Sequence, residues 1–68
     1  MDEERFNISL RKLLKHFGVT AQREVEKAVD SAQRSGALAG QSTLKARAVM
    51  TIEGLDAEIA VEGQIELA

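Results

Sequence analysis

The first third of the chain places its large apolar residues on one face of a helix. They recur at i, i+4, i+7, i+8 and i+11, the spacing of an amphipathic helix. These residues are Phe6, Leu10, Leu13, Leu14 and Phe17. Acidic residues 2–4 lie at the N-terminal end of this stretch and Lys15 and His16 at its C-terminal end, as the helix dipole favours. Gly18 suits the left-handed residue that closes a helix, so the pattern predicts a helix over about residues 3–17.

A second apolar stripe of smaller residues follows after Thr20, which is a good N-cap. The stripe consists of Ala21, Val25, Ala28, Val29 and Ala32. Gly36 is the expected end, so we predict a helix over about residues 21–35. Little more than Gly18 and Val19 joins the two helices, and they must therefore form a helix-turn-helix-like corner.

After residue 43 the apolar period changes from helical to two, which indicates β-strands. The alternating apolar positions are Leu44, Ala46, Ala48, Met50 and Ile52, then Leu55, Ala57, Ile59, Val61, Ile65 and Leu67. They predict strands over about 43–53 and 55–67. A two-residue turn at Glu53 and Gly54 pairs Met50 with Ala57 and keeps both apolar sets on one face.

These elements predict an α+β fold in which two N-terminal helices precede a C-terminal antiparallel β-hairpin (ααββ). The two helices are expected to cover the apolar face of the hairpin. The expected core consists of Phe6, Leu10, Leu13, Leu14 and Phe17 against Val25, Val29, Met50, Ile59 and Val61. With 68 residues, the chain is expected to form a single domain over 1–68.

Composition removes several classes of protein. The chain has no cysteine and one histidine, which excludes disulfides and the usual zinc clip. No apolar run approaches the length of a membrane span. The acidic start, residues 1–5, lacks the order of a secretion signal, so we expect a cytoplasmic protein without a membrane partner.

No group of residues has the composition of a catalytic, cofactor or metal site. His16 lies beside Lys15 at a predicted helix end, where a solvated histidine is common. Residues 36–42 differ from a phosphate-binding loop in glycine spacing and lack its lysine. The row of Glu58, Glu62 and Glu66 is better explained as a solvated strand face than as a cation site. We therefore expect no enzyme activity and no cofactor.

The predicted corner at residues 18–20 offers a DNA-binding alternative. Gly-Val-Thr is similar to the turn before a recognition helix, and a hairpin after it would suit a winged helix. In this alternative the helix that starts after Thr20 binds DNA. The candidate nucleic-acid contacts are Arg11, Lys12, Lys15 and Arg23. Charge opposes the alternative, because residues 36–68 carry two basic and five acidic side chains.

Short motifs along nearly the whole chain resemble one protein family. They are Glu-Glu-x-Phe-Asn, Arg-Lys-x-Leu-Lys, Gly-Val-Thr, Glu-x-Glu-Lys-Ala-Val and Val-Glu-Gly-x-Ile-Glu, at residues 3–7, 11–15, 18–20, 24–29 and 61–66. The sequence resembles a family of small bacterial proteins of this length that is described only as a domain of unknown function. The resemblance implies a bacterial cytoplasmic protein and supplies no active site.

The function that these features favour is a small non-enzymatic protein-interaction or adaptor module with an unidentified protein partner. Self-association is a further hypothesis, because a two-stranded sheet has two open edges. Pairing of sheet edges in a homodimer would cover a small apolar spot flanked by charges. The candidate self-association residues are Lys45, Arg47, Val49 and Ala60. The alternative is a monomer whose edges are protected by those charges.

Overall fold

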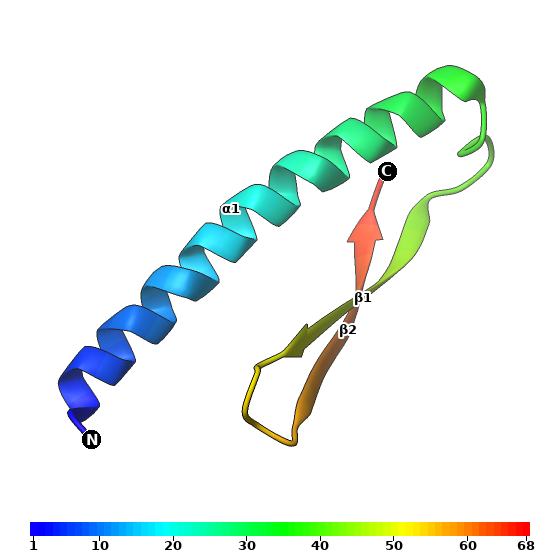
Figure 1. Cartoon of the computed structure of the whole chain (residues 1–68). Helices are drawn as coiled ribbons and strands as arrows, with labels where there is room; N and C mark the ends of the chain where they lie inside the picture. The colour runs from blue at the N-terminus through cyan, green and yellow to red at the C-terminus, as the bar shows by residue number, and fades with distance from the viewer. The chain divides into compact units, whose positions relative to one another are not determined.

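The computed structural model describes residues 1–68 and contains three elements (Figure 1). They are the helix α1 (Glu3–Ser35) and the strands β1 (Thr43–Thr51) and β2 (Glu58–Glu66). The chain divides into two compact units, Met1–Leu38 and Ala39–Ala68. The α+β class and the C-terminal hairpin are confirmed.

The predicted pair of N-terminal helices is wrong, because α1 runs without interruption through residues 18–20. Gly18 is not among the glycines with positive φ, and Thr20 lies inside the helix rather than at its N-cap. A glycine costs only about 1 kcal/mol in a helix interior. Ending one helix and starting another leaves up to eight backbone groups without helical partners. The continuous helix is therefore the better solution for this stretch.

Both ends of α1 are capped by the residues at its borders. The Asp2 carboxylate accepts a hydrogen bond from the backbone N–H of Arg5 at 3.0 Å, which satisfies one of the free donors of the first turn. Gly36 closes the helix with φ 79°, and the backbone N–H of Ala37 donates to the Ala32 carbonyl at 3.0 Å. The predicted end at Gly36 is confirmed.

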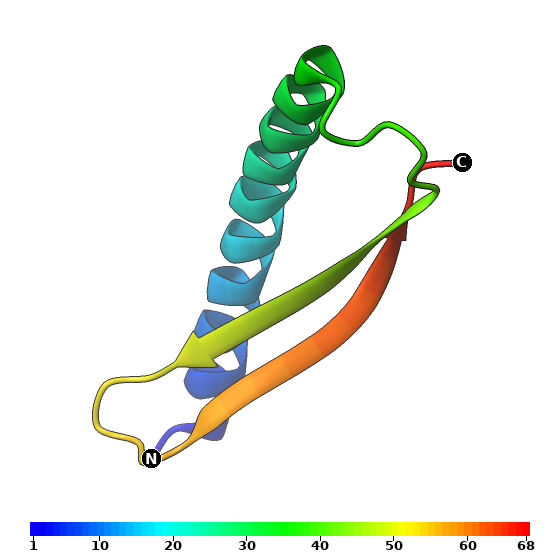
Figure 2. The ribbon, with the colours of Figure 1, turned by 90° about the vertical axis from the view of Figure 1, so that its right-hand side faces the viewer.

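Strands β1 and β2 form a two-stranded antiparallel sheet (Figure 2). The predicted register is wrong by two residues, because Met50 pairs with Ile59 and not with Ala57. A two-residue hairpin loop needs a positive φ at its first central position, which Glu53 does not adopt. The structure instead forms a β-turn in which the Leu55 N–H donates to the Ile52 carbonyl at 3.0 Å, and the pairing begins farther from the turn.

A shift of two residues leaves every side chain on its predicted face of the hairpin, because the side-chain period is two. One face carries Leu44, Ala46, Ala48 and Met50 of β1 with Ile59, Val61, Gly63 and Ile65 of β2. The expected core is not present in either unit, since no side chain in the chain is buried.

Candidate interaction surfaces

The two apolar stripes predicted for separate helices join into a single stripe along α1, except that Val29 lies about 40° outside it. We call this surface the α1 stripe. It consists of Phe6, Leu10, Leu13, Leu14, Phe17, Ala21, Val25, Ala28 and Ala32. At about 100° per residue, these nine positions span about 120° of the helix circumference. Phe6, Leu13 and Phe17 expose 51%, 53% and 52% of their surface, so the α1 stripe is open to solvent.

An eleven-residue repeat in the sequence holds the α1 stripe in phase across Gly18. Phe6, Phe17 and Ala28 are eleven residues apart, and so are Leu10, Ala21 and Ala32, and Leu14 and Val25. Eleven residues over three turns is 3.67 residues per turn, which nearly matches an undistorted helix. This repeat is the sequence signal for one continuous helix, and it is not visible when the two stripes are considered separately.

The four basic residues considered for nucleic-acid binding lie on the polar side of α1. Arg11, Lys12, Lys15 and Arg23 are all exposed and point away from the α1 stripe. Farther along the helix, Lys27 pairs with Glu24 at 3.6 Å and Arg34 pairs with Asp30 at 3.0 Å. The corner that would present a recognition helix is absent, because residues 18–20 are helical.

All four candidate self-association residues lie on the polar face of the hairpin. Val49 lies directly opposite Ala60. Arg47 lies opposite Glu62 and pairs with it at 3.4 Å, between side chains that are well exposed. Lys45 lies opposite Gln64.

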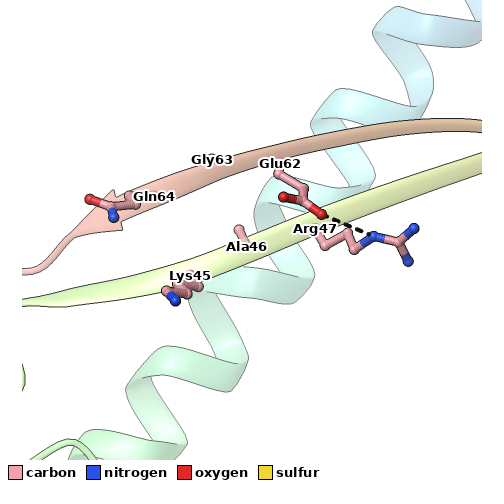
Figure 3. Close-up of a pocket in the computed structure, with 6 residues that line it drawn as sticks. All are labelled: Lys45, Ala46, Arg47, Glu62, Gly63 and Gln64. Carbon is pink, nitrogen blue, oxygen red and sulfur yellow. Dashed lines mark ion pairs between the residues drawn. The ribbon is translucent and has the colours of Figure 1, made fainter.

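A hollow of about 480 Å³ lies over the same part of the hairpin. Its lining residues are Lys45, Ala46, Arg47, Glu62, Gly63 and Gln64. Figure 3 shows the Arg47 and Glu62 side chains directed toward each other, while Lys45 and Gln64 lie farther along the strands. Gly63 has no side chain and lies opposite Ala46, which has a small one, so few side-chain atoms cover the strands at this point. Arg47 and Glu62 pair with each other here, and Lys45 adds one further positive charge.

The titratable residues of the chain do not form a metal-binding cluster in either unit. The structure has no cluster of three or more histidine, aspartate or glutamate side chains that could hold a metal ion. His16 lies inside α1 rather than at a helix end, and it is exposed. The helix also lacks an apolar stretch of the length needed to cross a membrane. The largest unexplained feature of the chain is thus the α1 stripe.

The chain belongs to a family of unknown function (DUF6494), whose profile matches residues 1–68. The resemblance to a small domain of unknown function is confirmed by this match. Neither the curated proteins nor the solved structures include a significant match to the chain.

Proposed function

We propose that this member of the family is a small non-enzymatic protein-interaction module, which binds its partner through the α1 stripe. The observation that supports the proposal is the nine-residue apolar face on a helix of 33 residues, with none of its side chains buried. Contiguous exposed apolar surface of this kind marks binding sites in proteins of ordinary solubility. An amphipathic helix also presents its anchors at the spacing that grooves and partner helices recognise.

The hairpin offers a smaller surface for the same kind of role. A homodimer through a sheet edge would use Lys45, Arg47, Val49 and Ala60, and the Val49–Ala60 pair is the only apolar spot on that polar face. Val49 exposes 43% of its surface. Two apolar residues provide much less area than the nine of the α1 stripe, so we favour α1 as the binding element.

A winged-helix-like DNA-binding protein is the alternative function, and the structure lacks the corner on which that hypothesis depended. Its basic residues are still available for phosphate contacts. Titration of a fluorescent random duplex at low salt tests this alternative. Binding that weakens steeply with added salt would replace the interaction proposal with the DNA-binding one.

Site-specific photo-crosslinking of the full chain, in the cells that produce it, tests the interaction role. A benzophenone amino acid replaces Phe17 on the α1 stripe, and in a matched variant it replaces Ile8. Ile8 is an equally exposed large apolar residue of α1, but it lies on the opposite side of the helix. The two variants therefore carry the same probe at similarly exposed sites and differ in the face of α1 on which it lies.

We expect strong adducts to protein from the Phe17 position and weak adducts from the Ile8 position. Equal labelling from both faces, or none from Phe17, would contradict the proposal. We also expect the adducts in the cytoplasmic fraction of a bacterial cell, because the family resemblance implies that compartment. Cell fractionation checks this expectation.

A further inference from the structure

Side-chain size changes along the α1 stripe from large to small. The first half carries two phenylalanines and three leucines, whereas the second half carries three alanines and one valine. We propose that the occupant of the α1 stripe is a second copy of this chain, whose α1 runs antiparallel to the first. The inference rests on the interaction role proposed above and names the partner of that same surface.

An antiparallel two-fold pair centred on residue 19 places four of the five large residues level with a smaller one, while Leu14 lies level with Glu24. The layers are Phe6 with Ala32, Leu10 with Ala28, Leu13 with Val25, and Phe17 with Ala21. Each layer occurs twice in a two-fold dimer. Large side chains against small ones fill space evenly, so the helices can stay at a constant separation of about 8–10 Å. A parallel pair would stack phenylalanine on phenylalanine at one end and alanine on alanine at the other.

The charges of α1 favour the same orientation. Residues 5–23 contain five basic and no acidic side chains, whereas residues 24–30 contain three acidic and one basic. The antiparallel register sets residues 8–14 against the net acidic residues 24–30 of the other copy, with Lys12 level with Glu26 but Arg11 level with Lys27. It also sets Lys15 level with Arg23, whereas a parallel pair would set Arg11, Lys12 and Lys15 all beside their own copies. Exposed charges contribute little affinity, but like charges brought together select against the wrong orientation.

The length of the α1 stripe is sufficient for such a dimer. The stripe extends from Phe6 to Ala32, about 39 Å along the helix axis. In this register two copies of α1 face each other over all of that length.

An amphipathic helix with basic residues could instead lie on an anionic membrane surface. A membrane surface would explain why the first half of α1 combines large apolar side chains with basic ones. It leaves the alanine-rich second half, with its acidic Glu24, Glu26 and Asp30, without a role. The second copy accounts for both halves, and we therefore favour it.

A charge-neutral size swap tests the register in the full chain. Leu10→Ala empties one layer, Ala28→Leu overfills it, and the double variant restores one leucine and one alanine to that layer. Ile8→Ala is the control for loss of an apolar side chain from the other side of α1. Alanine and leucine are both strong helix formers, so the helix itself is retained, and circular dichroism verifies this.

Sedimentation equilibrium over a wide concentration range measures the dimer dissociation constant of each variant. We expect Leu10→Ala to weaken the dimer at least about 30-fold, as loss of an interface anchor does. Ala28→Leu should also weaken it, whereas the double variant should return to within about tenfold of wild type. Residues 10 and 28 of one helix are about 27 Å apart, so only contact between two copies explains the rescue.

Spin labels measure the orientation directly, because the chain has no cysteine of its own. Glu4→Cys alone should give label pairs about 45 Å apart in the antiparallel dimer. A mixture of labelled Glu4→Cys and labelled Arg34→Cys chains should give pairs within about 20 Å. The opposite distances would show a parallel pair and overturn the proposal.

Three other results would also overturn it. They are a constant mass near 7.4 kDa at every concentration, a double variant no better than the single ones, and a dimer that Val49→Thr weakens but Leu10→Ala does not. Binding of a monomeric chain to anionic vesicles would assign the α1 stripe to a membrane surface. If Phe17 crosslinks only to a different protein, the interaction role stands and the second copy is wrong.

Discussion

Replacing Gly18 with alanine tests the continuity of α1 at the point where sequence patterning predicts a break. Gly18 lies in the interior of the helix, and a Cβ built on it meets no atom within 4 Å. The substitution therefore adds a methyl group in open space at helical backbone angles. Alanine is favoured over glycine in a helix interior by about 0.5–1 kcal/mol, because it loses less backbone entropy on folding.

We expect Gly18→Ala to raise the helical signal in far-ultraviolet circular dichroism and to raise Tm. A stabilisation of 1 kcal/mol corresponds to a Tm increase of about 4–8 °C in a domain of this size. Gly36→Ala is the matched control, because Gly36 holds φ 79° at the C-cap and an added Cβ is strained there. That variant should lower Tm. Both variants are measured at two protein concentrations, so that a change in association is recognised.

The reasoning would be refuted if Gly18→Ala lowered Tm or the helical signal. That result would mean that Gly18 needs a positive φ, as in a turn between two helices. The helix-turn-helix-like corner would then return as the better description. The sign of the effect alone decides between a continuous helix and a corner, since the control fixes what a strained glycine site looks like.

Three further changes test local features of the chain. Asp2→Ala removes the N-cap acceptor and should cost about 1 kcal/mol, seen as a loss of helical signal that Asp2→Asn largely avoids. Glu62→Gln breaks the exposed ion pair with Arg47 and should change the free energy of unfolding, measured by urea denaturation, by less than about 1 kcal/mol. A larger loss of stability would contradict this prediction. Gly63→Thr should stabilise β2 by about 0.5–1 kcal/mol, because the site is open and a strand prefers a β-branched residue; slower amide hydrogen exchange in β2 checks it, and faster exchange would contradict it.

The parts of the fold that the sequence predicts correctly are those fixed by local chemistry. The hairpin follows from the two-residue period after Thr43, and the end of α1 follows from Gly36. Asp2 lies at the N-terminal end, where an acidic side chain is favoured, and it caps the helix. Each of these features depends on neighbours within a few residues, so a short stretch of sequence is sufficient to predict it.

The predicted helix break and the predicted hairpin register were wrong because glycine occurs in more than one kind of local structure. Glycine ends many helices, yet Gly18 remains helical because the apolar phase on both sides of it is the same. Gly54 does have a positive φ, but Glu53 before it does not, so the turn is wider than two residues and the register moves. The glycine alone therefore does not predict the local structure. The apolar pattern on both sides of Gly18, and the residue before Gly54, determine it.

The length of the α1 stripe also bears on which surface can cover it. A nine-residue strand extends about 30 Å, whereas the stretch from Phe6 to Ala32 extends about 39 Å along the helix axis. The strands of the hairpin are therefore shorter than the α1 stripe by about a quarter of its length. A chain of 68 residues without cysteine has few other means of offsetting exposed apolar surface. A second α1 matches the first in length, and so it can cover the whole α1 stripe from Phe6 to Ala32.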